Sequence, residues 1–288
     1  MLLMFLSKHH NAPSDITRIW WCPTGPLAFL PLHAAGIYNQ SELPPSISCI
    51  SDFAVSSYTP TVSALLEKVK GPANVLSPFT GKLLIISQPN SQDCSPLPGT
   101  TEEMDIIQKT VGLENCKPLE AKDATVSKVK IEMQSHDSIH FACHANQNIG
   151  APLKSGFYLD DGRLELAEIM KQNIPQCELA FLSACQTSTG DEQLSEEAVH
   201  LAAGVLAVGY RGVVATLWSI KDEYGPVVAE SFYKYLMENG RIAGKMRLNS
   251  TNAARAIHHA IQSIRGRPEV GDTEKGLLTW VPYVHFGY

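Results

Sequence analysis

Short apolar runs alternate with longer amphipathic stretches through the middle of the chain. Residues 83–87 (LLIIS) form one such run, and residues 100–110 (TTEEMDIIQKT) follow with a polar, acidic start. An apolar run of about four to eight residues is typical of a strand that is covered on both faces of a sheet. Threonines and carboxylates ahead of apolar positions are typical of a helix N-terminus. The pattern predicts a strand at 83–87 and a helix at 100–110.

The same alternation continues to the end of the chain. It predicts further strands at 116–120, 138–143, 156–160, 179–185, 212–217 and 280–286, and helices at 125–134, 164–172, 195–208, 222–238 and 251–264. Helices between successive strands produce parallel pairing with right-handed crossovers. We therefore expect an α/β fold with a mostly parallel central sheet and helices on both of its faces. No unit of roughly 30 to 45 residues repeats, so this chain is not expected to hold a helical-repeat array.

The N-terminal quarter of the chain follows a less regular pattern. Residues 18–32 (RIWWCPTGPLAFLPL) combine a strand-like start with a Pro-Gly turn and a second apolar run, which predicts a hairpin or a strand followed by a helix. The other elements predicted here are a strand at 46–57 and a short helix at 61–70. Residues 71–81 are rich in Pro and Gly and mark an internal boundary. We therefore divide the chain into an N-terminal part at 1–78 and a second part at 79–288.

The strand predicted at 179–185 ends at a cysteine. Counted at period two, Leu179, Phe181, Ser183 and Cys185 share one face of this strand. The loop that follows, QTSTGD, is small and polar. Open α/β sheets place their sites at the carboxyl ends of the strands. This position makes Cys185 a candidate for chemistry.

A histidine follows the strand predicted at 138–143 in the same way. His144 comes after the run SIHFAC and before ANQNIGAPLKSG, 41 residues ahead of Cys185. Caspases place their histidine roughly 50 residues before their cysteine, whereas papain-type enzymes place the cysteine first. The order and spacing here favour the caspase arrangement. A lone cysteine is more often a small buried residue, so the catalytic and the structural interpretation both stay open on spacing alone.

A His–Cys pair of this kind can hydrolyse a peptide bond. A free cysteine is only a few per cent thiolate at neutral pH, and a neighbouring imidazole can take its proton. His144 would act as this base and later protonate the leaving amine. The backbone N–H groups of Cys185 and Ala145 would hold the oxyanion.

Other polar residues near these strands are expected to be structural. Cys143 lies on the strand face opposite His144 and is assigned to the core, and His140 is interpreted as a hydrogen-bonded core histidine. Glu102 and Glu103 are interpreted as charges at a helix start. The seven cysteines include no CxxC pair and the paired histidines are adjacent in sequence, so no metal or other cofactor is expected.

Composition and charge limit the partners and the compartment. The formal charge is −6, the pI is about 5.9, and lysines and arginines are scattered, so no nucleic-acid partner is expected. The dispersed cysteines indicate a reducing compartment. The apolar start of the chain lacks a basic flank, which makes a poor signal peptide, and no apolar run approaches the roughly 20 residues of a membrane span. We expect a soluble, cytoplasmic protein with a protein or peptide partner and no membrane contact.

Seven blocks of the sequence resemble those of CHAT domains, a caspase-related peptidase family usually attached to tetratricopeptide repeats. The blocks are PTGPLAFLPL at 23–32, LPGTTEE at 97–103, SIHFACHA at 138–145, LELAEI at 164–169, LSACQTSTGD at 182–191, GYRGVVATLWSIKD at 209–222 and WVPYVHFG at 280–287. They are spread from residue 23 to residue 287, so the resemblance runs along nearly the whole chain. The resemblance implies a caspase-like fold. It places His144 at the catalytic-histidine position and Cys185 at the nucleophile position.

The resemblance also implies roles for residues near this dyad. The family usually has glycine after the histidine, whereas this chain has Ala145, which offers its N–H to an oxyanion but has fewer allowed backbone conformations. Glu197 occupies an acidic position after the cysteine loop and is interpreted as structural. The position of Ser183 lines the substrate pocket in related enzymes. Because Ser183 is small and neutral, a neutral or apolar residue is expected before the scissile bond, and a basic preference would need Asp191 or Asp222.

Two functions remain open from the sequence. The first is a cysteine endopeptidase that cleaves protein substrates under the control of an attached or partner sensor module, such as a tetratricopeptide-repeat module. The second is a catalytically silent CHAT domain that acts as an interaction scaffold, in which Cys185 and His144 would lie too far apart to couple. The separation of these two residues distinguishes the functions.

Overall fold

The structure is a computed structural model. It describes residues 16–39, 46–70, 81–91, 94–146, 148, 150–172, 174, 177–183, 185–186, 196–242, 245–246, 248, 250–271 and 273–288. For residues 29, 39, 46–48, 67–70, 185–186, 196–200, 241–242 and 245–246 the description is of the backbone.

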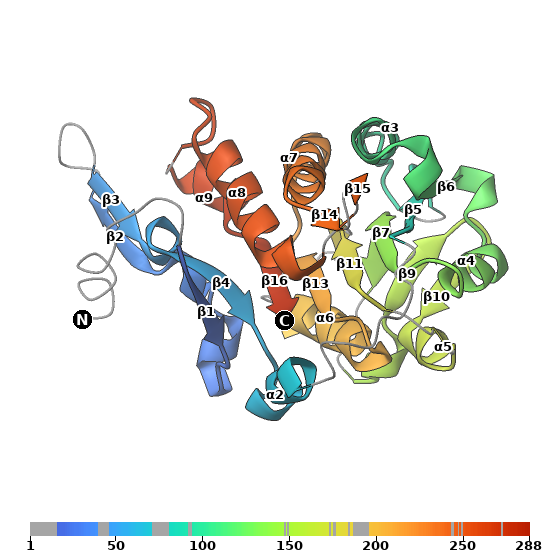
Figure 1. Ribbon diagram of the computed structural model, residues 1–288, viewed down its shortest axis with the longest axis horizontal. Helices are drawn as coiled ribbons and strands as arrows, with labels where there is room; N and C mark the ends of the chain where they lie inside the picture. Colours follow the sequence, from blue (N-terminus) through green and yellow to red (C-terminus); the bar gives the residue numbers. More distant parts are fainter. Residues whose placement is uncertain are drawn as a thin grey trace.

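An eight-stranded sheet runs through the centre of the molecule (Figure 1). In spatial order its strands are β1 (Thr17–Trp21), β4 (Ala54–Tyr58), β16 (Tyr283–Gly287), β13 (Gly212–Thr216), β11 (Leu179–Leu182), β7 (Ser138–Ala142), β5 (Leu83–Ser87) and β6 (Cys116–Glu120). The last five of these strands are parallel to one another. β16 is antiparallel to β13, and β4 and β1 run in the direction of β16. The predicted α/β fold with a mostly parallel central sheet is confirmed.

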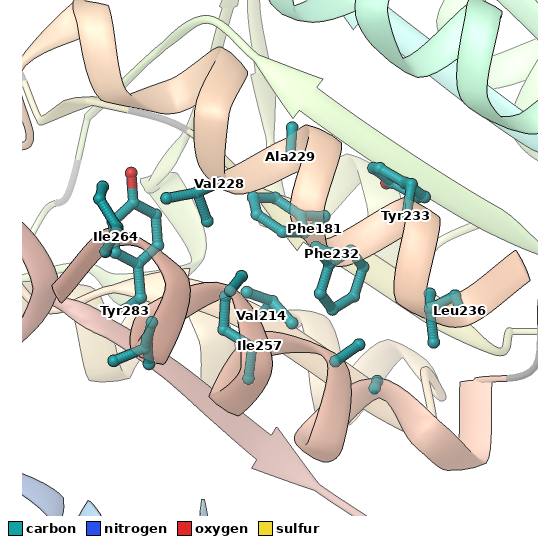
Figure 2. Close-up of a cluster of buried hydrophobic side chains, with 14 of the residues drawn as sticks. Phe181, Val214, Val228, Ala229, Phe232, Tyr233, Leu236, Ile257, Ile264 and Tyr283 are labelled. Carbon is teal, nitrogen blue, oxygen red and sulfur yellow. The ribbon is translucent and has the colours of Figure 1, made fainter. Parts of the chain in front are cut away.

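Helices cover both faces of this sheet (Figure 1). One face carries α3 (Gly99–Val111), α7 (Gly225–Glu238), α8 (Ala253–Arg265) and α9 (Glu274–Trp280), and the other carries α4 (Val126–Met133), α5 (Leu166–Met170) and α6 (Glu196–Val208). Each face of the sheet has its own core: the first lies under α3, α7, α8 and α9, and the second lies under α4, α5 and α6. Because side chains alternate along a strand, Leu83 and Ile85 of β5 enter the first core, whereas Leu84 and Ile86 enter the second. Figure 2 shows the first core, where Phe181 of β11 packs edge-on against Phe232 of α7.

A smaller sheet continues from the carboxyl ends of two central strands. Its order is β10 (Gly162–Glu165), β9 (Gly156–Leu159), β8 (His144–Asn146) and β12 (Cys185–Gln186). β7 leads into β8 through Cys143, and β11 leads into β12. The sequence predicted a single strand at 179–185, because the run gives no sign of the break after β11, and it predicted a strand at 138–143 without the second strand, β8, that follows.

The N-terminal part adds small elements around β1 and β4. They are the 3₁₀ helices η1 (Gly25–Phe29), η2 (Leu32–Ala34) and η3 (Ile50–Asp52), the hairpin of β2 (Gly36–Asn39) and β3 (Ser46–Cys49), and α2 (Val62–Lys70). The single strand predicted at 46–57 is therefore wrong: β3 and β4 are separate, because Asp52 accepts a hydrogen bond from the backbone N–H of Cys49 and turns the chain into η3. The boundary proposed at residue 78 falls outside the described residues, and the division into 1–78 and 79–288 stays a prediction.

The remaining described elements are short. They are η4 (Leu113–Asn115), η5 (Ala121–Asp123), η6 (Pro152–Lys154), η7 (Asp222–Tyr224), η8 (Ser250–Asn252), and the pair β14 (Arg241–Ile242) and β15 (Lys245–Met246). The helix predicted at 222–238 is thus η7 followed by α7, and the strand predicted at 280–286 starts three residues later, after α9. No helix in the described ranges is both long enough and apolar enough to cross a membrane.

His33 connects the N-terminal part to the end of the chain. It lies in η2 and is 3% exposed. Its Nε2 is 3.0 Å from the Val281 carbonyl oxygen, and its Nδ1 is 2.8 Å from the Tyr58 hydroxyl. A carbonyl oxygen can only accept a hydrogen bond, so Nε2 carries the proton and donates it to Val281. Burial lowers the pKa of His33 to about 4, and the bond to Val281 opposes this shift in part. The imidazole is therefore neutral at pH 7, with Tyr58 donating to Nδ1.

Acid is expected to destabilise the protein through His33. Between the ordinary histidine pKa of about 6.5 and the folded value of about 4, the unfolded chain binds a proton that the folded chain does not. The free energy of unfolding should therefore fall by about 3 kcal/mol from this residue as the pH drops from about 7 to about 4. Urea denaturation of the wild type and of His33→Gln over this range measures the contribution. The variant should lose less stability than the wild type, and equal losses in the two proteins would rule the contribution out.

Candidate active site

Cys185 and His144 lie directly opposite one another on neighbouring strands. The pairing of β7 with β11 runs from Ser138 opposite Leu179 to Phe141 opposite Leu182, and β8 pairs with β12 so that His144 is opposite Cys185. Every one of these pairs is separated by the same 41 residues, so the register of the central sheet continues into the small sheet. Adjacent strands are about 4.8 Å apart. The backbone thus agrees with the expectation of neighbouring strands, and the coupling of the two side chains stays a prediction.

The ring of His144 is held in one orientation. Its Nε2 is 2.7 Å from the Ser95 carbonyl oxygen, and the side chain is 3% exposed. A carbonyl can only accept, so Nε2 carries the proton in the neutral ring and Nδ1 carries the lone pair. Among the described residues, Nδ1 is a buried atom without a hydrogen-bond partner. The atom that could accept a proton from a neighbouring group is therefore Nδ1.

The loop that supplies the Ser95 carbonyl is fixed at both ends. This loop connects β5 to α3. At its start, the Gln88 N–H donates to the Ala142 carbonyl of β7 at 2.9 Å. At its end, the Gly99 N–H donates to an Asp222 carboxylate oxygen at 2.6 Å. Hydrogen bonds on both sides of Ser95 thus connect this part of the chain to β7 and to the start of η7.

The predicted substrate-pocket residues have different surroundings. Ser183 follows β11, is 6% exposed and donates from Oγ to Glu103 Oε2 at 3.0 Å. Asp222 is partly exposed at the start of η7, where it receives the Gly99 N–H. Asp191 lies outside the described residues. Asp222 and Ser183 therefore bond to opposite ends of one short segment: Asp222 to Gly99 and Ser183 to Glu103.

The predicted oxyanion donors lie on the same pair of strands. Ala145 is buried in β8, opposite Gln186 of β12 on one side and Phe157 of β9 on the other. Cys185 begins β12. The role of their N–H groups as oxyanion donors stays a prediction. Glu197 lies in the first turn of α6, where its backbone is described.

Glu103 is not the solvated helix-start charge that the sequence suggested. It is 2% exposed, whereas its neighbour Glu102 is exposed as expected. A sequence signal was present: Glu103 lies four and eight residues before Ile107 and Val111, so it falls on the buried face of α3. The core interpretation of His140 and Cys143 is confirmed, since both are fully buried.

No cluster of three or more metal-ligating side chains occurs in the part of the chain that the structure describes. Ser95 contributes a backbone carbonyl, for which a sequence carries no signal, so sequence reasoning missed this contact.

A family model of the CHAT domain matches residues 2–288. The chain belongs to the CHAT domain family. No curated protein matches the chain by sequence.

Solved structures show the same fold for this CHAT domain. It is similar to the "Arg specific cysteine proteinase gingipain R (RGPB)", with a TM-score of 0.56 and 9% identity over 99% of this chain and 66% of that one. It is also similar to the complex of the Porphyromonas gingivalis RgpB pro- and mature domains, with a TM-score of 0.53 and 10% identity over 99% of this chain and 68% of that one. At this identity the likeness shows the fold alone, the caspase-like α/β fold of the gingipain. The chain spans about two thirds of each gingipain chain.

Proposed function

We propose that this CHAT domain is a cysteine endopeptidase that hydrolyses peptide bonds in protein substrates. Cys185 is the nucleophile and His144 is the general base. The observation that supports the proposal is the register that sets Cys185 opposite His144, whose Nδ1 is buried and has no partner among the described residues. A base with a free lone pair on the strand next to a cysteine is the arrangement that activates a thiol.

The reaction follows from the protonation state of His144. Nδ1 takes the thiol proton of Cys185, and the thiolate sulfur attacks the scissile carbonyl carbon. The Ser95 carbonyl, which accepts from Nε2–H, stabilises the imidazolium that forms. The N–H groups of Cys185 and Ala145 stabilise the oxyanion of the tetrahedral intermediate.

The second half of the reaction returns the enzyme to its starting state. Collapse of the intermediate breaks the C–N bond, and Nδ1–H of His144 protonates the leaving amine. Nδ1 then takes a proton from water, whose oxygen attacks the thioester. The C–S bond then breaks, the acid leaves, and Nδ1–H of His144 returns its proton to the sulfur, which restores the Cys185 thiol. No metal or other cofactor takes part in these steps, and a cytoplasmic setting, in which thiols stay reduced, suits them.

Regulation by an attached or partner sensor module, such as a tetratricopeptide-repeat module, forms part of the same proposal. A peptide library digested by the protein, with cleavage products identified by mass spectrometry, tests the activity. Cleavage should occur and should persist in EDTA. The scaffold alternative predicts no cleavage by the protein in the presence of any partner, and loss of cleavage in EDTA would contradict the mechanism.

The same digestion reports the residue before the scissile bond. We expect a neutral or apolar residue, because Ser183 carries no charge and both oxygens of the nearby Glu103 carboxylate already accept hydrogen bonds in the protein interior. Asp222 is partly exposed and remains the described carboxylate that could select a basic residue. The gingipain in the comparison is named Arg-specific. Strong selection for Arg or Lys that survives Asp222→Ala and Asp191→Ala would contradict this expectation.

A further inference from the structure

One buried carboxylate, that of Glu103, accepts hydrogen bonds from both of the strand segments that lead to His144 and Cys185. Glu103 of α3 accepts a hydrogen bond at Oε1 from His140 Nε2 at 3.0 Å and at Oε2 from Ser183 Oγ at 3.0 Å. His140 belongs to β7 and Ser183 follows the last residue of β11. Glu103 therefore bridges adjacent strands from the helix above them.

This bridge lies just ahead of the dyad along both strands. His140 precedes His144 by four residues, and Ser183 precedes Cys185 by two. His140 is paired with Phe181, and their rings stack with centroids 4.7 Å apart. Because the same register continues to His144 and Cys185, any shift between β7 and β11 at the bridge would be passed on to the dyad.

The donors around Glu103 form an ordered chain. The Tyr233 hydroxyl on α7 is 3.0 Å from His140 Nδ1, and burial raises the pKa of Tyr233 well above its usual value, so the hydroxyl keeps its proton. Tyr233 donates to Nδ1, which leaves Nε2–H of His140 to donate to Glu103. Tyr233 and His140 are completely buried. Hydrogen bonds in such a dry interior fix the relative positions of the elements that carry them.

The space around the Glu103 carboxylate is also filled. Gly225, the first residue of α7, lies against it: a Cβ at this position would be 2.9 Å from Glu103 Oε2 and 3.5 Å from Ser183 Oγ. The carboxylate therefore has no room to move toward α7. Its position is set from both strands and from the helix beside it.

We infer that Glu103 is a positioning residue for the peptidase reaction, acting through His140 and Ser183. The inference rests on the proposed function. Glu103 fixes the register of the two strand ends and so holds Cys185 and His144 in reacting geometry. A misplacement of about 1 Å between reacting groups can lower the rate by about 10²-fold. Loss of the Glu103 hydrogen bonds should therefore affect the chemical step more than substrate binding.

Three substitutions separate the hydrogen bonds of Glu103 from its charge. Glu103→Gln can keep both contacts, because its amide oxygen accepts from His140 and its NH₂ group donates to Ser183 Oγ. Glu103→Ala loses both contacts. Glu102→Ala is the matched control, since it removes an exposed carboxylate from the adjacent position of the same helix.

We expect Glu103→Ala to lower kcat by about 10²-fold with KM changed by less than about twofold. Glu103→Gln should stay within about threefold of the wild type, and Glu102→Ala should match it. Thermal unfolding of each variant checks that the protein is folded at the assay temperature. Wild-type kcat in folded Glu103→Ala, or an equal loss in Glu103→Gln, would overturn the inference.

A second variant, Gly225→Ala, tests the same inference if Glu103→Ala does not fold. Gly225→Ala displaces the Glu103 carboxylate while every network residue remains, and Gly266→Ala is its control, because a Cβ there has no neighbour closer than 3.4 Å. We expect Gly225→Ala to lower kcat by about tenfold with an unchanged KM, and Gly266→Ala to leave kcat unchanged. Unchanged kcat in Gly225→Ala would overturn the inference.

The pH dependence of Cys185 alkylation by iodoacetamide separates failure of the inference from failure of the proposed function. In the wild type the midpoint should lie below that of an ordinary thiol, which is near pH 8.5, and in Glu103→Ala it should rise toward that value. An ordinary midpoint in the wild type would contradict the proposed dyad itself. A shifted midpoint that is the same in wild type and Glu103→Ala would contradict the role of Glu103 alone.

Discussion

Cys185→Ala is expected to abolish peptide cleavage, with kcat/KM lower by about four orders of magnitude or more. Without the thiol the protein has no nucleophile to form the thioester, and the oxyanion donors and substrate contacts contribute only a small residual rate. The variant should still fold, because alanine replaces the side chain with a smaller apolar one. Cleavage of a peptide substrate by purified wild type and variant, with thermal unfolding of both, measures the effect.

Cys143→Ala is the matched control for this substitution. Cys143 lies two residues after Phe141, in the same hydrophobic core, and is 0% exposed. Its removal should lower stability by about 1 kcal/mol and leave kcat/KM within a few-fold of the wild type. Retained cleavage in Cys185→Ala, or abolished cleavage in folded Cys143→Ala, would show that the nucleophile is misassigned.

His144→Ala is expected to lower kcat by about 10²- to 10⁴-fold with a smaller change in KM. Nδ1 of His144 is the proton acceptor, and its loss leaves the Cys185 thiol protonated at neutral pH and the leaving amine without a proton donor. Steady-state kinetics at pH 7 measure the loss.

His136→Gln controls for the removal of a histidine from the same strand region. His136 lies before β7, at the end away from the dyad, where its Nδ1 bonds to the Glu132 carbonyl at 2.7 Å. This variant should keep the wild-type kcat. A kcat in His144→Ala within about threefold of the wild type would exclude His144 as the base.

Much of the fold follows from local patterns in the sequence. The apolar run at 83–87 predicted β5 to the residue, because a buried strand flanked by turn residues has sharp ends. The bounds predicted for the strand at 116–120 also match those of β6, which lies at the edge of the sheet. The spacing of His144 and Cys185 also predicted their alignment: their residue numbers differ by 41, as do those of every residue pair between β7 and β11. A helix between two parallel strands returns the chain to the same level of the sheet.

Other features depend on contacts that a local pattern does not contain. The reversed direction of β16 is set by its pairing with β13, and the breaks before β8 and β12 arise where the chain leaves one sheet for another. The Ser95 carbonyl reaches His144 across 49 residues of sequence. Glu103 was missed for a different reason: carboxylates at a helix start are usually solvated, and its apolar neighbours at helical spacing outweigh that tendency.

The rate of alkylation of Cys185 at pH 6 tests the central claim, a thiol activated by His144, most directly. Cys22 is exposed and serves as an internal reference in the same molecule. An ordinary thiol with a pKa near 8.5 is less than about 1% thiolate at pH 6 and reacts slowly with iodoacetamide. Mass spectrometry of the labelled peptides should show Cys185 reacting at least about tenfold faster than Cys22, with the advantage lost in His144→Ala. Equal rates at Cys185 and Cys22, or an advantage that persists in His144→Ala, would contradict a His144–Cys185 dyad.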